Sequence, residues 1–243
     1  SRAGHPLAQM VHRGTRRPRA GRRRFAASCR GSGWSATPAV GPPKSIDQEA
    51  NVKAVVFHGV GDIRLDDVPE PKIQHPQDAI VRITTSAICG TDLHMVRGTV
   101  ADMVPGTILG HDGVGVIEEV GPAVRNFRPG DRVIIPSTIA CGYCAYCREG
   151  LFSQCDNANP NGKLAGTAFF GGPKSSGPFH GLQAQYARVP FAPVGLIKMP
   201  EDMADEQAIL LSDILPTGYF GADTADIVPG RTVAVFGCGP VGL

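Results

Sequence analysis

The chain has few aromatic residues, 6% of its 243 positions, and no apolar run that approaches the roughly 20 residues needed to cross a bilayer. The lack of a long apolar run predicts that the protein has no membrane partner. Glycine and proline are abundant instead, with 31 and 21 residues. Because both residue types punctuate turns, the composition favours a loop-rich β architecture over a helix bundle.

Acidic residues are absent from positions 1–46, where nine arginines and Lys44 give a charge of +10. All 22 acidic residues follow, beside the remaining 14 basic ones, so the rest of the chain carries −8. The basic tail has no hydrophobic period and contains Gly, Pro and Ser, which predicts that residues 1–50 are disordered.

Three origins of this tail compete: sequence translated upstream of the true start, a transit peptide, or a nucleic-acid-binding arm. We favour the first, because the chain opens on Ser1 and the tail is poor in serine and in the amphipathic spacing of a transit peptide. Nucleic acid is the least favoured partner. The tail leaves a cytoplasmic location as the expectation, with an organelle as the alternative if it is a transit peptide.

Short β-rich runs separated by Gly and Pro predict strands at 52–57, 79–88, 114–120 and 132–135. Such a series is typical of a β-barrel-like or sandwich-like domain. Acids at 205 and 206 favour a helix start over 205–211, which Pro216 then kinks or ends. Residues 231–236 read as a further, buried type of strand.

Four of the seven cysteines crowd into residues 141–155, at Cys141, Cys144, Cys147 and Cys155. Closely spaced cysteines in a loop can supply the tetrahedron of thiolates that Zn²⁺ prefers. The alternative is free or disulfide-bonded cysteines, and the lack of a secretory signal disfavours a disulfide framework. All four positions are filled by protein, so the pattern predicts a structural zinc site.

A second group is looser in sequence: Cys89 ends the predicted strand at 79–88, and His111 follows farther along. A Cys and a His joined by a distant third ligand form the pattern of a catalytic zinc with one open position. Two such residues on their own most often coincide by chance, so at this point they are candidates only.

Gly237, Gly239 and Gly242 form a Gly-x-Gly-x-x-Gly motif after the predicted strand at 231–236. Glycines there allow a tight turn and a close approach to a pyrophosphate. The helix and the acid about 20 residues on that would complete the motif are absent from the sequence. Gly113 and Gly115 lie inside a predicted strand without a third glycine, which indicates packing.

From about residue 52 to the C-terminus, these features in this order resemble the zinc-dependent medium-chain alcohol dehydrogenase family. The resemblance implies a mainly β fold with some α. It implies a GroES-like catalytic domain at 51–215 and, at 216–243, the truncated start of an NAD-binding Rossmann α/β domain. Two zinc ions per chain, one structural and one catalytic, NAD, and a homo-oligomeric full-length relative are also implied.

The resemblance implies that Cys89 and His111 are catalytic-zinc ligands, and it supplies Asp213 as the third, where the family usually has Cys. An Asp at this position is shared by a narrower subgroup, the glutathione-independent formaldehyde dehydrogenases and dismutases. The stretches 136–141 and 166–178 also resemble that subgroup. The implied substrate is formaldehyde or another small aldehyde or alcohol. Dehydrogenation and dismutation both stay open.

The resemblance also implies roles for residues around the metal. Thr91 would hydrogen-bond the substrate oxygen, His94 would pass the proton toward solvent, and Asp92 and Asp112 would orient the ligands. Read as residues alone, Thr91 caps a following helix, His94 is a solvated helix residue and Asp213 is a helix-surface acid. The family usually has Glu at position 112, so the shorter Asp112 predicts either a looser zinc or an adjusted backbone.

Since the cofactor domain is incomplete in this sequence, we expect the chain to bind zinc without turning over substrate. The alternative is a stand-alone zinc-binding GroES-like module that is not catalytic even in its complete form. Sequence beyond Leu243 would discriminate between them, because a continuing βαβ pattern favours the dehydrogenase.

Overall fold

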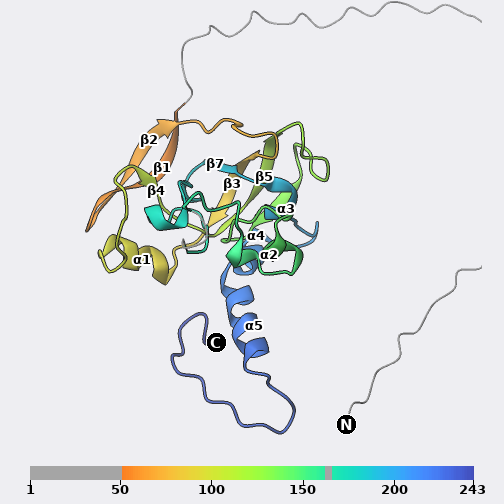
Figure 1. The fold of residues 1–243 in the computed structure, drawn as a ribbon. Helices are drawn as coiled ribbons and strands as arrows, with labels where there is room; N and C mark the ends of the chain where they lie inside the picture. The colour runs from red at the N-terminus through yellow and green to blue at the C-terminus, as the bar shows by residue number, and fades with distance from the viewer. Residues whose placement is uncertain (1–50, 162–165) are drawn as a thin grey trace, which may run out of the picture. The chain divides into compact units, whose positions relative to one another are not determined.

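The structure, a computed structural model, describes residues 51–161 and 166–243 (Figure 1). The predicted disorder of residues 1–50 concerns a segment that lies outside the described residues. The strands are β1 Asn51–Gly59, β2 Asp62–Pro69, β3 Ala79–Ser86, β4 Thr107–Ile108, β5 Gly113–Val120, β6 Arg132–Ile135, β7 Tyr186–Val189 and β8 Ile197–Lys198. The helices are α1 Gly90–Val96, α2 Ala145–Arg148, α3 Ala192–Gly195, α4 Asp205–Ala208 and α5 Ile214–Thr224, with 3₁₀ turns η1 Phe152–Gln154, η2 Lys174–Ser176 and η3 Ile209–Leu211.

One sheet has the strand order β2-β1-β4 and is antiparallel. Strand β1 confirms the prediction at 52–57: Val52, Ala54 and Val56 alternate along it and are at most 5% exposed. Such alternation is expected of a strand that buries one face. β2 was not predicted: Ile63 and Leu65 alternate with charged residues along it, but both are exposed, and the strand is paired along its length with β1.

The second sheet has the order β7-β3-β5-β6-β8, again antiparallel. Its central strands β3, β5 and β6 confirm the predictions at 79–88, 114–120 and 132–135. Val81, Ile117 and Val133 from these strands are at most 1% exposed and belong to the main hydrophobic core. The predicted mainly β fold with some α is thus confirmed, as two sheets with short helices (Figure 1).

Gly115 allows β3 and β5 to approach each other closely. A Cβ atom at this position would collide with the carbonyl oxygen of Arg82 and lie 2.6 Å from Val81 Cγ1. At Gly113, a Cβ would lie 2.9 Å from Leu182 Cδ1. Both glycines therefore serve packing, as predicted, because neither position has room for a side chain.

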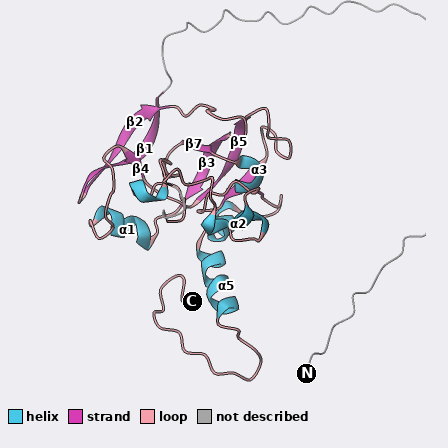
Figure 2. Cartoon of the chain, in the orientation of Figure 1, coloured by secondary structure: helices cyan, strands magenta, loops and turns pink. Residues whose placement is uncertain are grey.

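The C-terminal segment corrects two expectations. Pro216 neither ends nor breaks a helix: it lies in the first turn of α5, where its missing N–H costs no intrahelical bond. Residues 231–236 form no strand, and Phe236 is 97% exposed. A buried parallel strand is held by neighbours in its sheet, and no described strand pairs with this segment, which Figure 2 shows as a loop after α5. The predicted helix start at 205–211 is confirmed by α4 and η3.

Within residues 51–161 and 166–243, no helix combines the length and apolar character that a membrane span needs.

Candidate functional site

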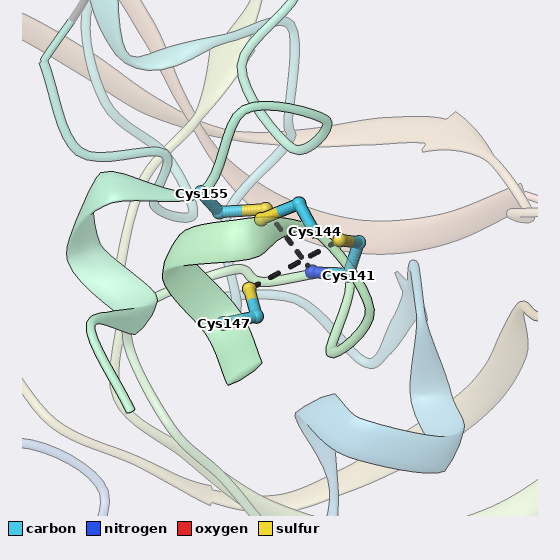
Figure 3. A group of neighbouring side chains, drawn as sticks. All are labelled: Cys141, Cys144, Cys147 and Cys155. Atoms are coloured by element: carbon cyan, nitrogen blue, oxygen red, sulfur yellow. Dashed lines mark hydrogen bonds between the residues drawn. The ribbon is translucent and has the colours of Figure 1, made fainter. Parts of the chain in front are cut away.

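The four cysteines of the 141–155 loop lie together. Their sulfur atoms are all within 4.8 Å of one another, and Cys141 Sγ lies 4.0 Å from Cys147 Sγ. Cys144 precedes α2, Cys147 lies in α2, and Cys155 follows η1 (Figure 3). A tetrahedron with Zn–S distances of about 2.3 Å places sulfurs just under 4 Å apart, so this spacing fits a zinc ion.

Hydrogen-bond donors point at these sulfurs. The backbone N–H of Cys141 donates to Cys155 Sγ at 3.2 Å, and the Asn157 side chain donates to Cys141 Sγ at 3.3 Å. An N–H from Cys147 is the main cause that lowers the pKa of the Cys144 thiol to about 6, whereas burial raises the pKa of Cys147 to about 12. Donors aimed at sulfur favour the thiolate, which is the form that binds metal.

A second group brings together Cys89, His111, Asp112 and Asp213, with ligand atoms within 4.8 Å of one another. His111 Nε2 lies 3.3 Å from Asp213 Oδ2 and 3.9 Å from Asp112 Oδ2. The three predicted ligands thus converge, and Asp112 joins them. These four residues are called the metal group below.

Three separate stretches of chain make this group. Cys89 follows β3 and is the N-cap of α1, His111 and Asp112 directly precede β5, and Asp213 is the N-cap of α5. The two strands are paired in one sheet, which places their ends side by side. Asp213 comes from much farther along the chain and arrives through α4 and η3.

Asp92 lies behind both Cys89 and His111. Its Oδ1 atom is 3.3 Å from His111 Nδ1, and its Oδ2 atom accepts a hydrogen bond from the Cys89 backbone N–H at 2.8 Å. Asp92 is 2% exposed and His111 3%. Asp92 Oδ1 and His111 Nδ1 are buried without a hydrogen-bond partner among the described residues, and at 3.3 Å each is the ion-pair partner of the other. A carboxylate in this position fixes the ring of a metal-binding histidine.

Hydroxyl groups hold the other two acids. Ser212 donates from Oγ to Asp112 Oδ1 at 2.9 Å, and Thr217 donates from Oγ1 to Asp213 Oδ1 at 3.0 Å. Although one methylene shorter than Glu, Asp112 carries its carboxylate to the metal group. Its two oxygens differ in role, because Oδ1 accepts the serine hydroxyl and Oδ2 faces His111.

The electrostatics of this group suit a cation. Burial lowers the pKa of His111, but hydrogen bonds to Asp213 and Asp92 outweigh it and raise the value to about 11. The hydrogen bond from His111 in turn lowers the pKa of Asp213, and burial raises that of Asp112. Several acids thus compete for one imidazolium, and a divalent cation would satisfy them better. A set of sulfur, nitrogen and oxygen donors is one that zinc accepts.

Thr91 and His94 lie in α1, three residues apart and so on one face of the helix. Thr91 Oγ1 is 3.9 Å from Cys89 Sγ, which places the hydroxyl beside the metal group. Because α1 begins at Gly90 with Cys89 as N-cap, the interpretation of Thr91 as the cap of a helix that begins after it is wrong. His94 is exposed, and its Nδ1 atom lies 2.9 Å from Thr99 Oγ1.

The predicted cofactor-binding glycines lie in an irregular turn: Gly237 has φ +97°, and the Gly242 N–H donates to the Gly239 carbonyl at 2.9 Å. They lie beyond α5, in the segment that forms no strand.

Sequence reasoning missed several residues around the metal group. Phe169 presents its ring edge-on to His111, with centroids 6.1 Å apart, and Gln183 donates from Nε2 to Asp92 Oδ2 at 3.3 Å. Ser212 and Thr217 had a signal, because they lie one and four residues from Asp213. Phe169 lies in the stretch 166–178 noted for its resemblance, which gave it no role at this site, and Gln183 had no signal, since only the fold brings the two residues to this place.

Comparison with known proteins agrees with this architecture. Residues 75–201 match the family model of the alcohol dehydrogenase GroES-like domain. A zinc-type alcohol dehydrogenase-like protein of Bacillus subtilis is 44% identical over 194 residues, which cover 79% of this chain and 51% of that protein. A glutathione-independent formaldehyde dehydrogenase of Pseudomonas aeruginosa is 41% identical over 201 residues, 79% of this chain and 49% of that protein.

Among solved structures, an alcohol dehydrogenase from Thermus sp. ATN1 superposes with a TM-score of 0.71 at 41% identity, covering 79% of this chain and 52% of that one. The fold and the two clusters of potential metal ligands therefore define a GroES-like domain of the alcohol dehydrogenase type. The chain belongs to the zinc-type medium-chain alcohol dehydrogenase family. It spans about half the length of the curated relatives it matches.

Proposed function

We propose that this chain is the zinc-binding part of an NAD-linked oxidoreductase that acts on formaldehyde or another small aldehyde or alcohol. The observation that carries the proposal is the convergence of Cys89, His111 and Asp213, from three distant parts of the sequence, into one group of ligand atoms. The Pseudomonas relative, named a glutathione-independent formaldehyde dehydrogenase, supports the choice of formaldehyde.

In this proposal Cys89, His111 and Asp213 hold the catalytic zinc, and the four cysteines of the 141–155 loop hold the structural one. A zinc ion bound by three protein ligands supplies a Lewis acid that polarises a carbonyl or stabilises an alkoxide. Asp92 keeps Nδ1 of His111 engaged, so that Nε2 presents its lone pair to the metal group. Asp112 Oδ2 lies 3.9 Å from His111 Nε2.

Thr91 and His94 are the residues that we propose for proton transfer. The Thr91 hydroxyl, beside Cys89, would accept a hydrogen bond from a substrate hydroxyl and, as it takes that proton during hydride loss, release its own proton toward solvent. His94 lies one helical turn farther along α1 and is exposed, so its ring can exchange that proton with solvent.

We further propose that residues 51–215 form the catalytic domain and that residues 216–243 open an NAD-binding domain, with Gly237, Gly239 and Gly242 at the pyrophosphate. By this proposal the 243-residue chain binds zinc but does not reduce NAD. The absence of a strand before Gly237 within the described residues supports it, because the nucleotide turn depends on a strand and a helix at its two ends.

Formaldehyde oxidation tests the proposal in two forms of the protein. The 243-residue chain should form no NADH from formaldehyde. A chimera of this chain with the remaining half of the Pseudomonas relative should form NADH, and His111→Ala in the chimera should abolish turnover. Robust activity of the 243-residue chain would overturn the division of labour between the two halves. A folded chimera with turnover indifferent to His111 would overturn the catalytic assignment.

A further inference from the structure

Gln183 occupies a fixed place between the first sheet and the segment that leads to His111. Its backbone N–H donates to the Leu109 carbonyl at 2.9 Å, and its carbonyl accepts from the Val55 N–H at 2.8 Å. The residue is therefore anchored on both sides by the backbone. Its position is set by the fold and not by a flexible loop.

The Gln183 side chain makes two hydrogen bonds, and both partners are acceptors. Nε2 donates to Asp92 Oδ2 at 3.3 Å and to the Ala87 carbonyl at 3.1 Å. Only the amide nitrogen can satisfy a carboxylate and a carbonyl together, so chemistry fixes the orientation of the amide.

The aliphatic part of the same side chain packs against the backbone beside the metal group. Gly110, which precedes His111, has φ +90°, and a Cβ there would lie 2.5 Å from Gln183 Cγ. Gln183 thus contacts the backbone next to His111 with its stem and the partner of the His111 ring with its amide.

We propose that Gln183 is a positioning residue of the catalytic metal site, acting through Asp92 on both Cys89 and His111. This inference rests on the proposed function, since it takes the group of Cys89, His111 and Asp213 as a zinc site. With the Cys89 N–H, the Gln183 amide occupies Asp92 Oδ2. Asp92 Oδ1 is then left to face the His111 ring.

The buried position of Asp92 makes this donor consequential. At 2% exposure the carboxylate has little access to water, so each lost donor is a lost solvating group. Without the Gln183 amide, the carboxylate is held by the Cys89 N–H alone on Oδ2 and is free to turn away from His111. Loss of an outer partner of this kind typically lowers metal affinity by about 10- to 100-fold.

The test is the affinity of the 243-residue chain for the zinc held by Cys89, His111 and Asp213, called here the second zinc. It is measured by competition with a chromophoric chelator. Gln183→Met keeps the volume and removes the donor. The matched control is Gln185→Met, because Gln185 lies two residues away and accepts a side-chain hydrogen bond from the Lys53 N–H, with no bond to Asp92. His111→Ala defines the signal of the catalytic site.

We expect Gln183→Met to weaken the second zinc by about tenfold or more, with the four-cysteine zinc and the melting temperature of the zinc-loaded chain little changed. Gln185→Met should leave both zincs at wild-type affinity. A Gln183→Met chain that binds the second zinc as tightly as wild type, while His111→Ala loses it, overturns this inference and leaves the proposed function intact. A wild-type chain that binds one zinc, or a His111→Ala chain that keeps two, overturns both.

An Asp92→Asn background separates positioning from general packing. If Gln183 acts through Asp92, adding Gln183→Met there should cost little further zinc affinity, because the route is already cut. An undiminished further loss in that background would refute the route. This comparison also holds if Gln183→Met lowers overall stability, because a general packing loss would weaken zinc binding equally in both backgrounds, whereas an effect through Asp92 requires the wild-type Asp92.

Discussion

Replacing Gly115 by alanine should destabilise the domain strongly, because β3 and β5 pair too closely for a side chain at that position. The added Cβ would collide with the Arg82 carbonyl oxygen, and it would lie 2.6 Å from Val81 Cγ1 and 3.1 Å from the Arg82 carbonyl carbon. Two of these atoms are backbone, and Val81 is fully buried. None of them can move aside as the end of a flexible side chain would.

The magnitude follows from overpacking and from disturbed strand pairing. Overpacking a close contact costs about 1–3 kcal/mol, and a weakened ladder hydrogen bond about 1 kcal/mol more. We therefore expect Gly115→Ala to lower the free energy of unfolding by about 3 kcal/mol, a change of roughly a hundredfold in the unfolding equilibrium. For a domain of this size that corresponds to a melting temperature lower by roughly 6–12 °C.

Urea unfolding of the zinc-loaded protein, at constant zinc concentration, measures this difference from the transition midpoint. The matched control is Gly59→Ala at the end of β1, where an added Cβ has no neighbour within 4 Å. The control should stay within about 0.5 kcal/mol of wild type. If Gly115→Ala were equally mild, the reasoning that this glycine serves packing would be refuted.

Three further predictions concern the metal groups. Cys144→Ala should remove one zinc and lower the melting temperature, because three thiolates no longer close the tetrahedron; retention of two zincs in metal analysis would contradict this. In the reduced, metal-free chain near pH 7, iodoacetamide should alkylate Cys144 before Cys147, because their thiol pKa values are about 6 and about 12 and only the first is then largely thiolate. Peptide mass spectrometry reads the order, and alkylation of Cys144 should slow as the pH falls below about 6, because its thiolate is then protonated. Ser212→Ala should cost about 2 kcal/mol in urea unfolding, since its hydroxyl donates to buried Asp112, and a change below about 0.5 kcal/mol would speak against that bond.

The core strands of the fold were predictable because their residues carry the information locally. Residues 132–135, with the sequence Arg-Val-Ile-Ile, follow a Pro-Gly-Asp turn, and β6 has these same bounds. The opposite case is 231–236, an equally apolar run that forms no strand. Apolar residues predict burial, and a strand also needs partners, which a sequence pattern does not supply.

The two groups of metal ligands also differed in how far the sequence alone could predict them. The four cysteines were predictable as one site because they are close in sequence, and the structure brings their sulfurs together. Cys89 and His111 became ligands only through the family resemblance, since their proximity depends on the pairing of β3 with β5. Gln183 lies far from both in sequence and carries no motif, so its contact with Asp92 could come only from the folded chain.

The stoichiometry of zinc in the 243-residue chain tests the central claim most directly. We predict two zinc ions per chain by native mass spectrometry, one lost in Cys144→Ala and the other lost in Asp213→Ala, with the double variant holding none. A wild-type chain with a single zinc that survives Asp213→Ala and disappears in Cys144→Ala would contradict the account, because the group of Cys89, His111 and Asp213 would then bind no metal.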